Sequence, residues 1–209
     1  KISGLSLCSV VPTLTDTIVV SLKNLTHQEP LIVGPGTRTG IQINYDRTQD
    51  VGADRIANAV AVNHIYGNPA IVIDMGTATV FDVMIKGPKY IGGAIAPGIQ
   101  VSAEAIARET SQLPKVELVA PPSVIGKNTI ESIQSGFVYG FVHMIEGMTK
   151  RIKTKIHKNE RDLVKVIATG GLAHIITPHT NIFYDVNKDL TLHGLRIIKD
   201  INQKDNAVK

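Results

Sequence analysis

The sequence predicts an α/β fold built around a mixed sheet. After residue 70 the expected elements run in the order β-β-β-α-α-β-α before a last helix, which is typical of a sheet covered by helices. Aromatic residues make up 4% of the chain and tryptophan is absent, so Ile, Val, Leu and Ala must build the core. Hydrophobic residues make up 43% of the 209 residues and charged residues 19%. This composition supplies a core and excludes a disordered charged tail.

Residues 1–68 are expected to form part of one α/β unit. Apolar runs broken by Gly and Pro predict its extended segments, and a spacing near 3.6 residues predicts its helices. The extended segments are 2–11, 30–33 and 41–43, and the helices are 14–25 and 54–66. Pro12 is expected to end the first segment, and Asp54 stands where a carboxylate can cap the free N–H groups of a helix.

Residues 69–209 are expected to form a second unit. Two β-rich runs flank a short Gly/Thr turn and predict a hairpin over residues 70–85. A glycine-rich third strand follows at 90–98. The remaining elements are helices over 101–110, 130–157, 172–176 and 190–201, and a strand over 164–168.

Charge and cysteine usage limit the partners and the compartment. A net charge of +4 is mild and favours small anionic ligands as readily as nucleic acid. The basic run over 150–161 contains no aromatic residue, so we interpret it as a solvated helix face and expect no nucleic-acid partner. No apolar run reaches the ~18 residues of a membrane span, so no membrane partner is expected. The single cysteine, Cys8, cannot form an internal disulfide, which favours a reducing compartment and hence a cytoplasmic location.

The hairpin turn is the most informative stretch. A buried strand delivers Asp74 to its end, and Gly76 lets the backbone approach a ligand closely. Thr77 and Thr79 offer hydroxyls, and the loop N–H groups can face an anion. The turn therefore suits a phosphate and a cation. A plain hairpin with Asp and Gly for geometry explains the same residues equally well.

A second feature is the tetrapeptide 52–55, Gly-Ala-Asp-Arg. Phosphoryl transfer to an alcohol needs a carboxylate positioned on the hydroxyl and positive charge near the phosphates. Asp54 suits the first role, and Arg55 suits an anionic end of the substrate. On these residues alone, the more common explanation is that Asp54 caps the helix and forms a surface ion pair with Arg55.

Two junctions next to expected helices add weaker signals. Gly170 and Gly171 follow Thr169 between a strand and a helix, where a nucleotide can lie against the backbone. A β-to-α turn commonly contains glycine for geometry alone. Asn128 or Thr129 is placed to cap the long helix, which is the simplest explanation for both.

In this order, the motifs resemble the type III pantothenate kinases over nearly the whole chain. Each marker is weak alone, and the ordered set is specific. Besides residues 52–55, 74–79 and 169–171, the markers are residues 34–36, 39–40, 92–98, 113–115, 126–129 and 135–136.

The resemblance implies two ribonuclease-H-like domains of the actin and sugar-kinase superfamily, with ATP between them. Residues 1–68 would be an incomplete N-terminal domain, and residues 69–209 the C-terminal domain. It also implies a homodimer that uses ATP and Mg²⁺ to phosphorylate the primary hydroxyl of pantothenate, the first step of coenzyme A synthesis.

The resemblance also implies roles for the residues at the matching positions of this sequence. Asp54 matches the base that takes the proton from the pantothenate hydroxyl, and Asp74 matches the ligand of a monovalent cation, K⁺ or NH₄⁺. The substrate contacts are Tyr45, Gly52, Ala53, Asp54, Arg55 and Thr129. The expected ATP contacts come from the hairpin turn and from the glycines that follow Thr169. They are Gly76, Thr77, Thr79, Gly170 and Gly171. One predicted helix and one predicted strand separate Asp54 from Asp74, a connection that can return both carboxylates to one edge of a cleft.

The sequence departs from the family at its start. Family members begin with a strand–turn–strand that carries Asp-x-Gly-Asn-Thr, a first phosphate loop that also helps to place Mg²⁺. This sequence contains no such segment and opens with Lys1 inside an apolar run. We therefore expect that an upstream portion is missing, so that this sequence has half of its phosphate clamp, and absence of the other half would be a reason for inactivity.

Two alternative functions stay open on the sequence. A non-catalytic accessory regulator of transcription on the same fold would be favoured if the first phosphate loop were lost in the natural gene. Retention of Asp54, Arg55, Asp74 and Thr77 favours the enzyme. A kinase of another small alcohol would share the fold, which does not determine the substrate.

Overall fold

The computed structural model describes residues 2–204, and internal contacts divide the chain into two compact units. Of the described residues, the first unit contains 2–68, 83–92 and 189–204. The second contains residues 69–82 and 93–188. The assignment of residues 1–68 and 69–209 to an incomplete and a complete ribonuclease-H-like domain stays a prediction.

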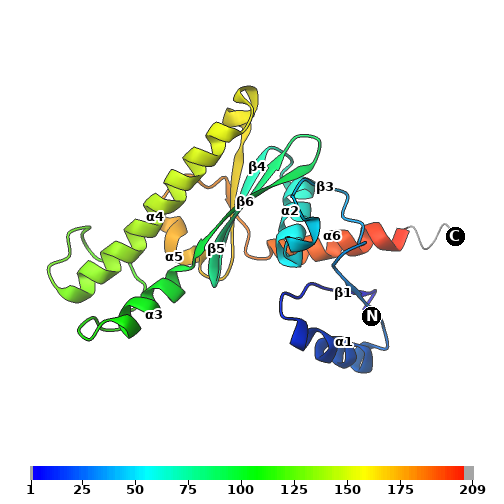
Figure 1. Ribbon diagram of the computed structural model, residues 1–209, viewed down its shortest axis with the longest axis horizontal. Coiled ribbons are helices and arrows are strands. Elements are labelled where there is room, and N and C mark those ends of the chain that lie inside the picture. Colours follow the sequence, from blue (N-terminus) through cyan, green and yellow to red (C-terminus); the bar gives the residue numbers. More distant parts are fainter. Residues whose placement is uncertain (1, 205–209) are drawn as a thin grey trace. The chain divides into compact units, whose positions relative to one another are not determined.

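A six-stranded sheet has the order β3-β6-β5-β4-β7-β8. Figure 1 labels its strands β3, β4, β5 and β6. Strands β4, β5 and β6 follow one another through short turns and therefore run antiparallel. Strand β7 pairs in parallel with β4, and β8 in parallel with β7. The sheet is thus mixed, and the predicted α/β class is confirmed. The strands are β3 (Gln42–Ile43), β4 (Ala70–Met75), β5 (Ala78–Ile85), β6 (Lys89–Pro97), β7 (Lys165–Thr169) and β8 (Asp185–Val186).

Aliphatic side chains form the core of this sheet, as the composition predicts. Residues 70–73 of β4 have no exposed surface, and neither do Phe81 and Met84 of β5. A strand buried on both faces reads as a continuous apolar run, which explains why β4 is recognisable in the sequence. The run ends at Asp74, which is half-buried.

Two helices of the first unit, α2 (Ala53–Ile65) and α6 (Leu190–Lys204), pack against each other. Residues 56–62 of α2 are all buried. A Cβ on Gly194 of α6 would collide with the carbonyl oxygen of Ala57, so the two backbones approach as closely as glycine permits. The Thr191 hydroxyl donates to Asn58 Oδ1 at 2.7 Å. These contacts hold the helix that carries Asp54.

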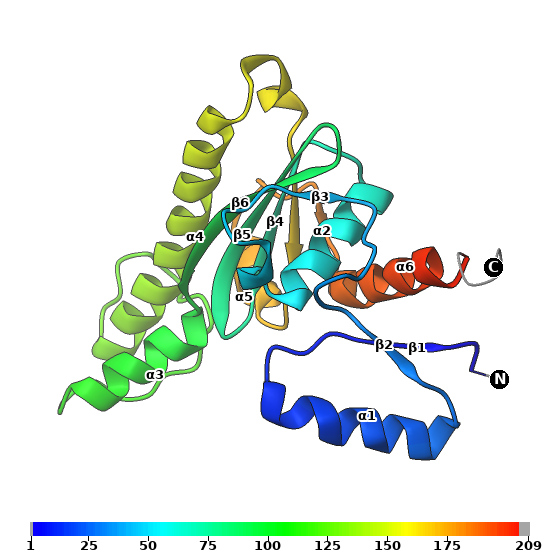
Figure 2. The same ribbon diagram turned by 45° about the vertical axis from the view of Figure 1, so that its right-hand side comes forward.

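The start of the first unit is more open. A two-stranded parallel sheet joins β1 (Leu5–Leu7) to β2 (Pro30–Ile32), with α1 (Pro12–Thr26) between them in the chain (Figure 2). The strand predicted over residues 2–11 is wrong in length, since only residues 5–7 are extended in the sheet. The chain turns toward α1 at Ser9, whose Oγ accepts from the backbone N–H of Val11 at 3.2 Å and from the Thr15 hydroxyl at 2.7 Å.

Helices α3 (Ile99–Glu109), α4 (Thr129–Lys155) and α5 (Ala173–Ile176) belong to the second unit, where α4 contacts both α3 and α5. The predicted helix over 172–176 is a four-residue turn of α-helix that continues as a 3-10 turn. Sequence patterns do not indicate β8 or three 3-10 turns, each of which is too short to show a period. The 3-10 turns are Thr48–Asp50, Lys158–Leu163 and Thr177–His179.

Among residues 2–204, no helix combines the length and apolar character that a membrane crossing requires.

Candidate active site

The turn between β4 and β5, in the second unit, is one candidate region. The Gly76 N–H donates to the Ala78 carbonyl at 3.0 Å, which closes a two-residue connection. Asp74 pairs in register with Thr169 of β7, so the carboxyl end of β7 lies beside it. Thr77 is exposed, whereas Thr79 retains only 1% of its surface. Of the two hydroxyls expected to meet ATP, only that of Thr77 is therefore at the surface.

Two glycines, Gly98 and Gly170, pack closely against the β4–β5 turn. The Gly98 N–H donates to the Thr77 carbonyl at 3.0 Å, and a Cβ on Gly98 would lie 2.5 Å from the same oxygen. A Cβ on Gly170 would lie 2.5 Å from both Asp74 Oδ1 and the Met75 carbonyl oxygen, and Gly170 has a φ of +93°. The structure thus brings Asp74, Gly76, Thr77 and Gly170 together within the second unit.

The connection from β7 to α5 adds a further bond to this turn. The Leu172 N–H donates to the Met75 carbonyl at 2.9 Å. Gly171 is exposed, and a Cβ added to it would meet no heavy atom within 4 Å. The predicted Gly170–Gly171 segment therefore has one glycine packed on Asp74 and one facing open space.

Asp74 is a half-buried carboxylate next to a backbone carbonyl, and both groups offer hard oxygen donors. No group of three or more His, Cys, Asp or Glu side chains that could hold a metal ion occurs among residues 2–204. Mg²⁺ bound with nucleotides commonly uses one or two carboxylates plus phosphate oxygens and water, so this donor set fits a phosphate-bound cation. It does not fit an all-protein metal cage.

A second candidate region lies at the N-terminus of α2, in the first unit. Gly52 is the N-cap residue and makes no side-chain cap, so Asp54 lies in the first turn and is not the cap that its position in the sequence predicts. Its Oδ1 accepts from the Arg55 N–H at 2.8 Å. A Cβ on Gly52 would lie 2.5 Å from Asp54 Oδ1 and 3.6 Å from Val10 Cγ1, so glycine leaves room for this carboxylate.

The end of β1 approaches the same carboxylate. The pKa of the Cys8 thiol is raised, first by burial and second by the negative charge of Asp54. A Coulombic effect of this kind requires the two groups to be near each other. In the sequence, Cys8 indicates only a reducing compartment, so its proximity to Asp54 is information from the fold.

Arg55 and Tyr45 meet on a residue that no sequence motif singles out for function. The Arg55 Cζ lies 5.8 Å from the centroid of the Tyr90 ring, and the Tyr45 and Tyr90 centroids are 6.3 Å apart at 44°. Tyr90 is 1% exposed. In the sequence, Tyr90 marks only the start of a glycine-rich strand, because its partners are distant along the chain.

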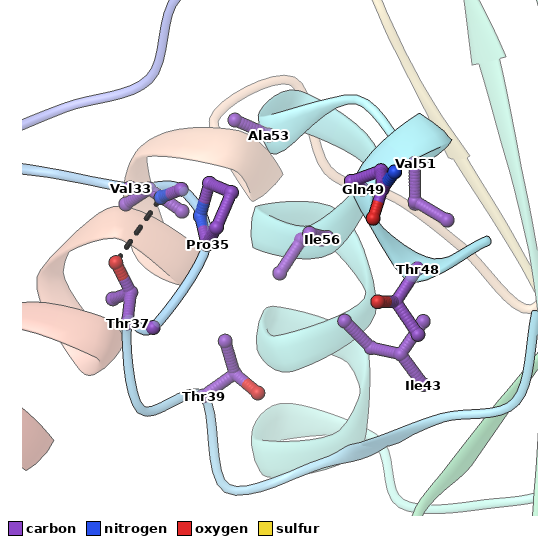
Figure 3. A pocket seen from close by; sticks show the side chains of 12 residues that line it. Val33, Pro35, Thr37, Thr39, Ile43, Thr48, Gln49, Val51, Ala53 and Ile56 are labelled. Atoms are coloured by element: carbon purple, nitrogen blue, oxygen red, sulfur yellow. Dashed lines mark hydrogen bonds between the residues drawn. The ribbon is translucent and has the colours of Figure 1, made fainter.

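A separate pocket of about 230 Å³ lies beside α2 in the first unit (Figure 3). Side chains from the loop at residues 33–39 line one side, and side chains from residues 48–56 line another. The loop is closed by its own bonds, since the Gly34 N–H donates to the Thr37 hydroxyl at 3.1 Å. Asp54 is not among the lining residues, and the volume is below the ~300–1,000 Å³ of typical ligand pockets.

Thr129, the remaining predicted substrate contact, is the first residue of α4 in the second unit and is exposed. The preceding Asn128 caps this helix, because its Oδ1 accepts from the Glu131 N–H at 2.9 Å. Glu131 Oε2 in turn accepts from the Lys127 N–H at 2.9 Å. The pair of bonds is similar to a capping box, except that Lys127 rather than the N-cap Asn128 donates to the Glu131 side chain, and it leaves the Thr129 side chain outside the capping bonds.

The chain is similar in sequence to one family of known proteins. A family model described as type III pantothenate kinase matches residues 1–151. Type III pantothenate kinases from Dehalococcoides mccartyi and Moorella thermoacetica are 46% and 47% identical to the chain over 203 residues. Each alignment covers 97% of this chain, and 77% and 78% of the respective relative.

The chain is also similar in structure to a solved protein from Campylobacter jejuni, named for the Baf family of transcriptional activators, with a TM-score of 0.64. That protein is 21% identical, and the alignment covers 98% of this chain and 85% of that one. At this identity the likeness concerns the fold alone.

Proposed function

The chain belongs to the type III pantothenate kinases, and we propose that it transfers the γ-phosphoryl group of ATP to the primary hydroxyl of pantothenate. This reaction is the first step of coenzyme A synthesis. The observation that carries the proposal is the identity of 46% and 47% to two such kinases across 97% of the chain. The retained Asp54–Arg55 pair and the Asp74–Thr77 turn supply the chemistry that the reaction needs.

In this proposal Asp54 is the base. Its Oδ1 accepts from the Arg55 N–H at 2.8 Å, which fixes the orientation of the carboxylate. Within residues 2–204, no hydrogen bond is made to Asp54 Oδ2, so this oxygen is available to accept the proton of the pantothenate hydroxyl. Little covalent chemistry is required beyond this step, because phosphoryl transfer depends mainly on positioning and charge.

The β4–β5 turn holds the nucleotide end of the reaction. Asp74 would bind a monovalent cation, K⁺ or NH₄⁺, and the backbone around Gly76 and Thr77 would face the phosphates. Mg²⁺ bound to ATP would neutralise the charge that develops on the transferred group. Gly170 and Gly171 would lie near the adenosine. The close packing of Gly170 on Asp74 supports this arrangement, because it keeps the turn in one conformation.

Arg55 would bind the carboxylate of pantothenate, with Tyr45, Gly52, Ala53 and Thr129 as further substrate contacts. We also propose a homodimer and a cytoplasmic location. Both follow from membership of the family, and the exposed position of Thr129 at the start of α4 is compatible with a contact to a neighbouring subunit.

ATP-dependent phosphorylation of pantothenate by the full-length protein tests the function, with and without K⁺. We expect turnover that requires K⁺ or NH₄⁺ and is lost in Asp54→Asn. A wild type that does not phosphorylate pantothenate with K⁺ or NH₄⁺ present would reject the enzyme and leave the regulator as the better hypothesis. A panel of other small alcohols, assayed in parallel, tests the choice of acceptor.

A further inference from the structure

Tyr90 occupies a fixed position in the first unit. It lies in β6, pairs in register with Ile43 of β3, and accepts a hydrogen bond on its carbonyl oxygen from the Asn44 N–H at 2.8 Å. Only 1% of its surface is exposed. A buried ring on a hydrogen-bonded strand has little freedom to move, so it can serve as a reference surface for more mobile side chains.

Two side chains rest against this ring, and both belong to the proposed acceptor site. The guanidinium of Arg55 lies within the ~6 Å range of a cation–π interaction, with Cζ 5.8 Å from the ring centroid. The Tyr45 ring is tilted at 44° with its centroid 6.3 Å away, a normal separation for an aromatic pair. Tyr45 is 38% exposed, so the buried ring supports a partner that reaches the surface.

Gly92 extends the same surface two residues further along β6. It has a φ of +104°, and a Cβ there would lie 3.3 Å from Tyr45 Cε2. Residues two apart on a strand face the same side, so Gly92 and Tyr90 both lie next to the Tyr45 ring. The absence of a side chain at Gly92 leaves the space that Tyr45 occupies.

We propose that Tyr90 is a positioning residue for the acceptor: its ring holds the Arg55 guanidinium and the Tyr45 ring in place to receive the carboxylate of pantothenate. The inference rests on the proposed function. It adds to the proposed acceptor site a residue, Tyr90, that sequence motifs and spacing did not identify. An arginine that is already oriented loses less side-chain entropy when it binds a carboxylate, so the effect falls on acceptor affinity.

The test compares Tyr90→Leu with Tyr90→Phe in the full-length kinase. Loss of the ring in Tyr90→Leu should raise the KM for pantothenate by roughly 2- to 30-fold, the range of a cation–π contact. The KM for ATP and the kcat should change little. Tyr90→Phe keeps the π-system and should stay close to the wild type. Equal KM values for pantothenate in the wild type and Tyr90→Leu would overturn the proposal.

A neutral acceptor separates positioning from structural support. In the analogue, a primary amide replaces the carboxylate of pantothenate, so no charge remains for Arg55 to bind. If Tyr90 acts through Arg55, Tyr90→Leu should raise the KM for pantothenate much more than the KM for the amide. An equal rise for both acceptors would mean that the ring only supports the fold, and would reject the proposal.

Because Tyr90 is buried, Tyr90→Leu could fail to fold, and a shape-conserving series covers that outcome. Phenylalanine with increasing fluorination at position 90 keeps the ring and weakens its negative face. The KM for pantothenate should rise with each step of fluorination, and a flat series would contradict the proposal. A wild-type enzyme that does not phosphorylate pantothenate would instead reject the proposed function itself, so the two failures are distinguishable.

Discussion

The two candidate regions, one in each unit, are built by different means. At the start of α2, side chains make the site: Asp54 with Arg55, and Arg55 with Tyr45 on the ring of Tyr90. At the β4–β5 turn, backbone makes it, and Gly98 and Gly170 approach so closely that neither tolerates a Cβ. The α2 region should therefore be sensitive to a change of functional group, and the β4–β5 turn to an added methyl group.

The largest expected effect is chemical and falls on the α2 region. Asp54→Asn keeps the shape of the side chain and removes the proposed base, so kcat should fall by about 10²- to 10⁴-fold. The midpoint of thermal unfolding should stay near that of the wild type, since the Arg55 N–H can still bond to the amide oxygen. A steady-state assay and a melting curve measure both. A kcat within a few-fold of the wild type would remove Asp54 from the mechanism.

The next effect is steric and falls on the turn. Gly170→Ala places a methyl group 2.5 Å from Asp74 Oδ1 and the Met75 carbonyl, at a φ of +93°. Overpacking and the left-handed conformation should each cost about 1–3 kcal/mol of unfolding free energy. The KM for ATP should rise as well. Denaturant titration and steady-state kinetics measure the two quantities.

Gly171→Ala is the matched control for this substitution. A Cβ on Gly171 meets nothing within 4 Å, so its unfolding free energy should stay within about 1 kcal/mol of the wild type. If both alanine variants lose the same stability, the close approach of Gly170 to Asp74 is not what holds the turn.

A smaller effect, an increase in the unfolding free energy, is expected where a glycine in a helix has open space around it. Gly147 lies on the exposed side of α4, and a Cβ there meets nothing within 4 Å. Gly147→Ala should raise the unfolding free energy by about 0.5–1 kcal/mol, because alanine loses less backbone entropy in a helix. Denaturant titration checks this, and a loss of stability would point to a contact at this face of α4.

The smallest expected effect is a change in the pKa of the Cys8 thiol near Asp54. Burial and the Asp54 charge raise the pKa of the Cys8 thiol, so less thiolate is present at a given pH than in an unfolded chain. Asp54→Asn removes the charge and leaves the burial, so the pKa should fall part of the way back. The rate of Cys8 alkylation near pH 8 should then rise by less than about tenfold, the change for one pKa unit.

A pH profile of alkylation, recorded for the wild type and for Asp54→Asn, gives both midpoints. Asp50→Asn serves as the control, since it removes one negative charge from the same region of the chain without being a cause of the Cys8 shift. An unchanged Cys8 profile in Asp54→Asn would mean that the two groups are farther apart than the structure places them.

Most elements are predictable from the sequence for a local reason. The continuous apolar run of β4, the helical period of α2 and α4, and the Gly/Thr turn after Asp74 are short-range patterns, and each element forms where its pattern lies. The strand predicted over residues 2–11 is too long because an apolar run does not reveal that Ser9 turns the chain. β8 has two residues and offers no pattern to recognise.

The amino-acid sequence determined the α/β class, the family and the candidate residues Asp54 and Asp74, because periodicity, turn chemistry and ordered motifs are properties of neighbours along the chain. The tertiary structure alone decided that Gly170 packs on Asp74, that Asp54 lies near Cys8, and that Arg55 and Tyr45 share the ring of Tyr90. Those contacts join residues that are far apart in sequence, and their distances depend on how strands pair and helices pack, which no local pattern encodes.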